Sequence, residues 1–345
     1  MTLDTQSPAP GAGVPETAPV ILEVQNLKKY FAQRHGMFVR HSIRAVDDVS
    51  FTLEAGETIG LVGESGSGKT TVGRTIVRLY EPTDGKIIFR GQDIAHASEK
   101  ELTGVRREMQ MVFQDPYASL NPRMRVRDLV REPLITHGLW DEMGGSQRID
   151  ELLEMVGLSP RYANRYPHEF SGGQRQRIGI ARALALKPQV LILDEPVSAL
   201  DVSIQAQIVN LLEELQDELK LSYLFVAHDL AVVRHISDQV AVMYLGRIVE
   251  LGSKHDVFRK ASHPYTQALL SSVPIPDPSS SRRRRRIILQ GDLPNPANPP
   301  SGCRFRTRCP IATDRCAQET PELVNRPGVD HLVACHYAEP KDMLT

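Results

Sequence analysis

Short apolar runs and amphipathic stretches take turns along this chain from residue 20 onward. Strict alternation or a continuous apolar run predicts a strand, and apolar residues spaced three to four apart predict a helix. By these criteria the predicted strands are 20–24, 49–53, 58–62, 86–90, 109–113, 190–193 and 223–227. The predicted helices include 69–80, 149–156, 174–186 and 204–219. Strands that alternate with helices indicate an α/β fold with a largely parallel sheet.

Three segments depart from this alternation. Residues 1–19 are rich in Pro, Ala, Gly and Thr and predict a disordered N-terminal tail, because they cannot bury enough apolar surface to offset their ordering entropy. Residues 115–186 are mostly polar and helical, which predicts a helical subdomain inserted into a main domain of 20–260. Residues 261–345 contain many prolines and little periodicity, which predicts a separate C-terminal extension.

Composition and charge narrow the class of protein. The 345 residues carry 41 Lys and Arg against 42 Asp and Glu, which argues against a nucleic-acid binder that works through bulk positive charge. No apolar run approaches the roughly 18 residues that cross a bilayer, and the N-terminus lacks the features of a secretory signal. We therefore expect a cytosolic chain unless a partner holds it at a membrane. The run from Arg282 to Arg286 has no interleaved aromatics and is expected to be a solvated linker.

A glycine-rich segment between a predicted strand and a predicted helix contains the first candidate binding motif. It matches G-x-x-x-x-G-K-[ST] throughout, with Gly63, Glu64, Ser65, Gly66, Ser67, Gly68, Lys69 and Thr70, and Thr71 follows. Glycines allow backbone N–H groups to turn toward phosphate oxygens, and the helix N-terminus adds its positive dipole end. Lys69 is predicted to contact the β- and γ-phosphates and Thr70 to bind Mg²⁺. This phosphate loop, residues 63–70, predicts binding of a nucleoside triphosphate.

The predicted strand 190–193 ends in two carboxylates. Asp194 is placed to enter the Mg²⁺ shell, and Glu195 follows it, where it can act as the general base that polarises the attacking water. An apolar run before Asp-Glu is weak by itself, but downstream of a phosphate loop it predicts the second half of a hydrolytic site.

A second anion-binding helix start follows the helical insert. Ser171, Gly172, Gly173 and Gln174 precede an amphipathic helix, so their backbone N–H groups form a second phosphate-binding element. The chain has only one complete phosphate loop. The simplest arrangement is a head-to-tail pair in which this signature segment, residues 171–174, closes over nucleotide held by the other subunit.

With these residues in place, the chain resembles the ATP-binding-cassette ATPases over about residues 20–260. The resemblance implies a RecA-like P-loop core with an antiparallel β subdomain and a helical subdomain. It further implies that Gln114 senses Mg²⁺ and water, that Asp201 in the loop 198–201 communicates across the dimer, and that His228 contacts the γ-phosphate. Phe31 resembles the aromatic that stacks on adenine, with Tyr30 as the alternative.

Residues 115–123, 165–170, 198–208 and 263–266 are similar to the oligopeptide/dipeptide importer ATPases, although Phe170 replaces the common Leu before the signature. This implies ATP hydrolysis coupled to peptide import at the cytoplasmic face of the inner membrane. The implied partners are two transmembrane permease subunits, an extracytoplasmic peptide-binding protein, and a second cassette that is either a sister ATPase or a copy of this chain. Rival functions are importers of nickel, opines or sugars and, further away, a soluble cassette ATPase of translation or DNA repair.

All four cysteines lie in the C-terminal extension, namely Cys303, Cys309, Cys316 and Cys335. Zinc sites favour cysteine pairs two to four residues apart, and this extension has none. A [4Fe–4S] cluster tolerates looser spacing, but the pattern alone leaves a metal and four reduced thiols both open. Similarity to the importer extension favours the cluster, with Zn²⁺ second. His331 and His336 flank Cys335 and are expected to be packing or surface residues.

Overall fold

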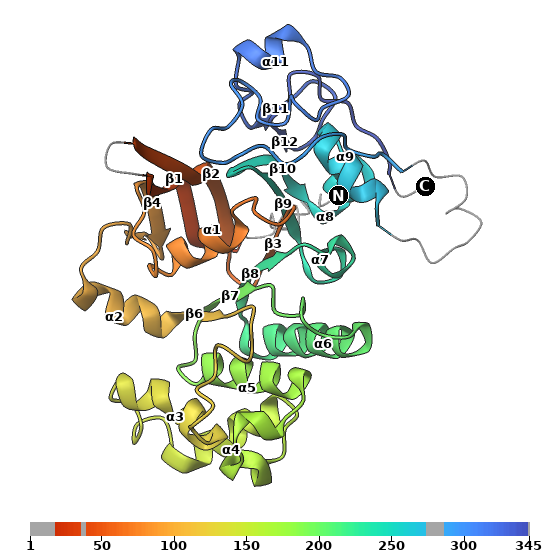
Figure 1. The fold of residues 1–345 in the computed structure, drawn as a ribbon. Coiled ribbons are helices and arrows are strands. Elements are labelled where there is room, and N and C mark those ends of the chain that lie inside the picture. Colours follow the sequence, from red (N-terminus) through yellow and green to blue (C-terminus); the bar gives the residue numbers. More distant parts are fainter. Residues whose placement is uncertain (1–17, 36–38, 274–285, 344–345) are drawn as a thin grey trace, which may run out of the picture.

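The computed structural model describes residues 18–35, 39–273 and 286–343, and an eight-stranded sheet forms its centre (Figure 1). The strand order is β11-β12-β10-β9-β3-β8-β7-β6. From β9 to β6 neighbouring strands are parallel, and β10, β12 and β11 continue the sheet in antiparallel fashion. The bounds are β3 (Thr58–Val62), β6 (Met109–Val112), β7 (Val190–Asp194), β8 (Ser222–Ala227), β9 (Gln239–Tyr244), β10 (Arg247–Ser253), β11 (Val324–Asn325) and β12 (Leu332–Val333). The expected α/β fold with a parallel core is confirmed.

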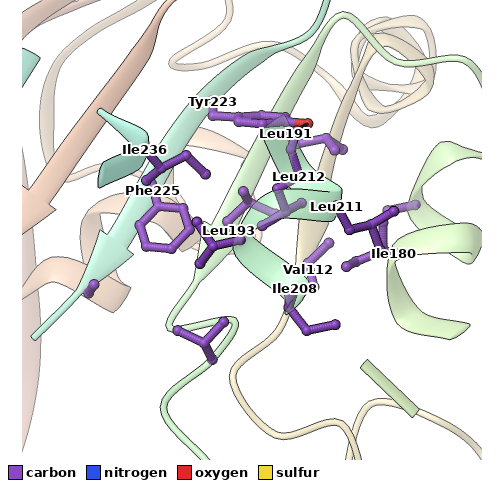
Figure 2. Close-up of a cluster of buried hydrophobic side chains, with 14 of the residues drawn as sticks. Val112, Ile180, Leu191, Leu193, Ile208, Leu211, Leu212, Tyr223, Phe225 and Ile236 are labelled. Carbon is purple, nitrogen blue, oxygen red and sulfur yellow. Dashed lines mark hydrogen bonds between the residues drawn. The ribbon is translucent and has the colours of Figure 1, made fainter. Parts of the chain in front are cut away.

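Helices cover this sheet because its central strands are apolar on both faces. The helices of the main domain are α1 (Lys69–Ile76), α2 (Glu99–Glu108), α6 (Val202–Leu219), α7 (Leu230–Ile236) and α8 (Lys254–Arg259), and α9 (Pro264–Ser271) follows at the start of the extension. In β7, Leu191 and Leu193 belong to the cluster with Leu212 of α6, whereas Ile192 belongs to the cluster with Ile76 of α1. Figure 2 shows the first of these clusters between the sheet and the helices. The side-chain alternation of one strand thus joins two cores.

A second, antiparallel sheet of order β2-β1-β4-β5 packs beside the first. Its strands are β1 (Val20–His35), β2 (Val39–Glu54), β4 (Asp84–Phe89) and β5 (Gln92–Asp93). The hydrophobic pattern predicted only 20–24 and 49–53 of the long hairpin. The described side chains of residues 28–32 and 42–45 are partly or fully exposed, and basic residues such as Lys28, Lys29 and Arg44 interrupt the apolar positions there, so the alternation that marks a half-buried strand is lost.

The helical insert lies at one end of the molecule (Figure 1). It contains α3 (Val126–Thr136), α4 (Gly145–Met155), α5 (Gly172–Leu184) and the short 3₁₀ turns Pro160–Asn164 and Pro167–Glu169. The described residues 115–186 contain no strand, as predicted.

Helix α1 ends at Ile76 rather than at residue 80, because Arg78 adopts a left-handed conformation with φ of 56°.

The C-terminal extension lies at the opposite end, beside β10 and β2 (Figure 1). It contains α11 (Asp314–Gln318), β11 and β12, and β12 pairs with β10 so that the extension joins the main sheet. The predicted N-terminal tail up to residue 17 and Arg282 to Arg285 of the arginine run fall outside the described residues. Within the described ranges, no helix combines the length and the hydropathy required to cross a membrane.

Candidate functional site

The phosphate loop joins β3 to α1 and forms one wall of a pocket of about 430 Å³. Gly68 has a φ of 105°, and a Cβ placed on it would lie 2.1 Å from the carbonyl oxygen of Ala45. Only glycine fits there, so β2 can pass directly behind the loop. The pocket is lined by Ile43, Ala45, Ser65, Gly66, Gly68, Lys69, Thr70, Thr71, Gln114, Glu195, His228 and Pro296. The fold therefore gathers residues from six separate segments of the sequence.

Lys69 is buried and turned toward the loop itself. Its Nζ donates to the carbonyl oxygens of Gly63 at 2.7 Å and Glu64 at 3.1 Å. Burial lowers the pKa of Lys69, and three nearby carboxylates oppose this effect, those of Glu195, Asp194 and Glu64. An ammonium group held by carbonyl oxygens inside a cradle of N–H groups is ready to exchange those partners for phosphate oxygens.

Asp194 and Thr70 meet beneath the pocket. The Thr70 hydroxyl donates to Asp194 Oδ1 at 2.8 Å, and Asp194 Oδ2 is buried without a hydrogen-bond partner. Burial raises the pKa of Asp194, against the opposing effects of the Thr70 hydroxyl and Arg74. A hydroxyl beside an unsatisfied carboxylate oxygen is a donor set that Mg²⁺ prefers, so the residues present fit the predicted ion.

Gln114, Glu195 and His228 follow β6, β7 and β8 respectively, and parallel strands bring them to one edge of the sheet. Gln114 Nε2 donates to Glu195 Oε2 at 2.8 Å, and His228 Nδ1 lies 3.4 Å from the same oxygen. Glu195 has a φ of 46°, which turns its side chain out of the line of the strand. The three residues predicted to take part in hydrolysis are therefore assembled around one carboxylate.

The two aromatics proposed for adenine lie outside the pocket lining. The Phe31 ring packs edge-on against Tyr80 with centroids 5.3 Å apart, and Lys29 Nζ lies 5.0 Å from its centroid. The Tyr30 hydroxyl donates to the buried carboxylate of Asp47. In this structure the apolar side of the pocket is instead formed by Ile43, Ala45 and Pro296.

The signature segment lies away from the phosphate loop of its own chain. Ser171 caps α5, since its Oγ accepts from Gln174 N–H at 3.3 Å while the Gln174 side chain accepts from Ser171 N–H at 3.0 Å. Ser171, Gly173 and Gln174 line a separate pocket that shares no residue with the nucleotide pocket. Asp201, exposed at the start of α6, is likewise outside the nucleotide pocket. This separation is what the head-to-tail arrangement requires.

Sequence reasoning missed three lining residues, Ile43, Ala45 and Pro296, and the last of them, Pro296, belongs to the C-terminal extension. Its carbonyl oxygen accepts from Arg44 N–H at 3.2 Å, which anchors the extension to β2 at the pocket. Leu293 lies next to the phosphate loop, 3.7 Å from the position a Cβ on Gly66 would occupy. No local pattern signals this contact, because it joins segments more than 200 residues apart.

The cysteines share one region of the extension without forming a metal site. No group of three or more His, Cys, Asp or Glu among the described residues is arranged to hold a metal ion, so the structure does not support the predicted iron–sulfur or zinc site as it stands. Burial raises the pKa of Cys303 and of Cys335 to about 11, and nearby cysteines add to both shifts. The cysteines are therefore close neighbours, and burial favours the thiol form of Cys303 and Cys335. His331 is buried and His336 more exposed, as expected of packing and surface residues.

Comparisons with known proteins agree with this geometry. The ABC transporter family model matches residues 46–198, and the family model described as the C-terminal region of oligopeptide/dipeptide transporters matches residues 249–316. The oligopeptide transport ATP-binding protein AppF of Bacillus subtilis is 58% identical over 319 residues, which cover 92% of this chain and 97% of that protein. A putative peptide import ATP-binding protein of Brucella ovis is 54% identical over 316 residues, covering 91% and 97%.

Solved structures place the fold in the same group. A dimeric ATP-binding cassette in a post-hydrolysis state with ADP and Pi is 30% identical, with a TM-score of 0.60 over 68% of this chain and 99% of that chain. A cassette of the cbiONQ transporter complex from Clostridium perfringens is 29% identical, with a TM-score of 0.60 over 70% and 91%.

Proposed function

Because this chain belongs to the ATP-binding-cassette ATPases, we propose that it is the ATP-hydrolysing subunit of a membrane importer for di- and oligopeptides. The observation that carries the proposal is the docking of an importer-type C-terminal extension onto a complete nucleotide site, through Pro296 in the pocket wall. The relatives named above as oligopeptide and peptide transport proteins support the substrate class. The implied location is the cytoplasmic face of the inner membrane, against two permease subunits.

The proposed mechanism assigns a task to each assembled residue. Lys69 and the phosphate loop bind the β- and γ-phosphates, and Glu195 accepts a proton from the attacking water, which Gln114 and His228 orient. Thr70, Asp194 and Gln114 would hold Mg²⁺, which when bound neutralises charge on the transferred phosphoryl group. Ser171 to Gln174 of a second cassette complete the site from the other side, and Asp201 contacts the dimer partner. Phe31 or Tyr30 would reach adenine only after moving from the packing described above.

The uptake experiment uses cells that lack this chain and require an amino acid supplied only within peptides. The unaltered chain is expected to restore growth on di- to oligopeptides, and Glu195→Gln is expected to restore none, because only the base of hydrolysis is removed. Purified Glu195→Gln should still bind MgATP and should dimerise in its presence. Glu218→Gln, which removes an exposed carboxylate of α6, is the matched control and should behave as wild type. Uptake by Glu195→Gln, or restoration of nickel, opine or sugar uptake without peptide uptake, would contradict the proposal.

We further propose that the four cysteines form the ligand set of a metal centre, with [4Fe–4S] first and Zn²⁺ second. Support comes from their confinement to one short, proline-rich module and from the electrostatic influence that they exert on one another. Loading would require the thiols to approach and to lose the protons that burial now stabilises.

Metal analysis after anaerobic purification tests this assignment. A brown protein with absorbance near 400 nm, about four iron atoms per chain, and loss of both in Cys316→Ser is the expected result. Zinc at one atom per chain would replace the iron–sulfur assignment with the second alternative. A metal-free, folded protein with four alkylatable thiols would refute both, and His336→Ala serves as the control from the same module.

A further inference from the structure

Two arginines of the extension reach the nucleotide-binding core from positions next to cysteines. Arg304 follows Cys303, and Arg308 precedes Cys309. Between them Phe305 is fully buried against Tyr244 of β9 and Tyr265 of α9, with ring centroids 5.2 and 5.4 Å away. This aromatic cluster fixes the segment 303–309 against the back of the phosphate loop.

Arg308 contacts the phosphate loop directly. Its guanidinium lies 2.9 Å from Glu64 Oε2, and both side chains are mostly shielded, with 10% and 29% of their areas exposed. The backbone N–H of Glu64 donates to the Tyr265 hydroxyl at 2.9 Å, so Glu64 is held at both its main chain and its side chain.

Arg304 contacts the same loop indirectly, through the turn at Leu245 and Gly246. It donates to the carbonyl oxygen of Leu245 and to the carboxylate of Asp47, and it is 8% exposed. The next residue, Gly246, donates from its N–H to the carbonyl oxygen of Ser67 at 2.8 Å. The extension thus contacts the phosphate loop directly at Glu64, through Arg308, and indirectly at Ser67, through the turn at Leu245 and Gly246.

Glu64 is an unfavourable neighbour for a triphosphate unless its charge is cancelled. Its charge already acts on Lys69, the cation of the loop, and Lys69 Nζ bonds the Glu64 carbonyl oxygen at 3.1 Å. A carboxylate whose charge acts on Lys69 would also repel phosphates bound to Lys69, and shielding from water makes such repulsion stronger than it is on an open surface. The guanidinium of the partly buried Arg308 lies close enough to the Glu64 carboxylate to neutralise its charge and so to reduce this repulsion.

We propose that Arg308 is a positioning residue of the nucleotide site, which holds and neutralises Glu64 so that the phosphate loop accepts a triphosphate. The C-terminal extension is then part of the ATP site. The proposal concerns affinity for nucleotide and is independent of which solute the importer carries, so it can fail without affecting the proposed function.

Calorimetric titration of the full chain with the Mg²⁺ complex of AMP-PNP, a non-hydrolysable ATP analogue, tests it. Arg308→Gln is expected to raise Kd on the order of tenfold, because a partly shielded charge is left unpaired. Arg308→Lys keeps the charge and should stay within about threefold of wild type. In steady-state hydrolysis, Arg308→Gln should raise KM for ATP and leave kcat unchanged, because Gln114, Glu195 and His228 are untouched.

Restoration of nucleotide affinity by a second substitution shows whether the defect of Arg308→Gln arises from charge. Glu64→Gln combined with Arg308→Gln should return Kd to within about twofold of wild type, since the repulsion and its cancellation disappear together. The defect of Arg308→Gln should also shrink in 1 M salt, where the screening length falls to about 3 Å. Arg306→Gln is the matched control, because Arg306 donates to Ser301 within the extension, at 2.9 Å.

Wild-type affinity in a folded Arg308→Gln, or failure of Glu64→Gln to rescue it, would overturn the proposal. Should Arg308→Gln not fold, the single variant Glu64→Gln decides: the proposal requires binding equal to or tighter than wild type. Weaker binding would mean that the geometry of the pair matters and its charge does not.

Discussion

Glu195 combines catalytic chemistry with a costly backbone conformation. Its φ of 46° lies in the left-handed region, which costs a residue with a Cβ about 1 kcal/mol. Its N–H donates to the carbonyl oxygen of Val226 on the neighbouring strand at 2.9 Å, and this bond holds the turn. The turn directs the carboxylate toward Gln114 and His228. Such conformations persist where the surrounding fold enforces them, and they concentrate at sites of chemistry.

His263 is the residue whose protonation the fold resists most clearly. It is 1% exposed, and burial lowers its pKa from 6.5 to about 3. Its Nδ1 accepts from the backbone N–H of Tyr265 at 3.1 Å and so caps α9, and the backbone N–H of His263 donates to Glu250 Oε2 at 3.1 Å. The ring must therefore stay neutral for the cap to form.

The pH dependence of stability follows from that shift. The unfolded chain binds a proton at this histidine below pH 6.5 and the folded chain does not until about pH 3. The contribution of neutral His263 is complete above pH 6.5 and declines as pH falls, by about 1.4 kcal/mol per pH unit. Urea unfolding at pH 7, 6 and 5 should show this slope in wild type and lose it in His263→Asn, whose amide still caps. The exposed His255→Asn is the control, and equal slopes in wild type and His263→Asn would contradict the assignment.

At the scale of the element, the sequence predicted β3 and the core of β6, β7 and β8 closely, because each is a short apolar run ended by a polar residue or glycine. Strands β9 and β10 were not predicted, since only the turn at Leu245 and Gly246 separates them within one nearly continuous apolar stretch. Chemistry that depends on a local motif, such as Lys69 in its loop, could be predicted. Chemistry that depends on contacts between distant segments, such as Pro296 and Arg308, could not.

Strand β12 is too short to have been predicted, yet it attaches the extension to the main sheet. It pairs with β10 at only two positions, Glu250 with Val333 and Leu251 with Leu332. Next to it His331 Nε2 lies 2.6 Å from Oε1 of Glu250, and both side chains are buried. Glu250 also accepts from the N–H groups of Ser262 and His263. One buried carboxylate therefore joins β10, the start of α9 and the extension.

At the scale of the whole molecule, the helical insert and the C-terminal extension lie at opposite ends with the nucleotide site between them (Figure 1). The insert carries the signature segment, which serves a partner cassette in the proposed pair, whereas the extension reaches the phosphate loop of its own chain. Coupling between two sites is reciprocal, so an extension that favours nucleotide binding must itself be stabilised when nucleotide binds. Docking of the extension and binding of ATP are then thermodynamically coupled, so that a change in the free energy of one changes the free energy of the other.

The substitution His331→Ala tests this linkage at a residue that is distant in sequence from the phosphate loop. Loss of the imidazole removes the hydrogen bond that joins the extension to the buried Glu250 carboxylate, which should destabilise the docked extension by about 2 kcal/mol. Hydrogen exchange should quicken in residues 293–335, Mg²⁺ with AMP-PNP should slow it again, and KM for ATP should rise. The control His336→Ala removes a histidine that contacts the Glu319 carbonyl oxygen and the Tyr337 ring, both within the extension, and it should change neither the exchange of residues 293–335 nor KM. Faster exchange with an unchanged KM would show that the extension and the nucleotide site are energetically independent.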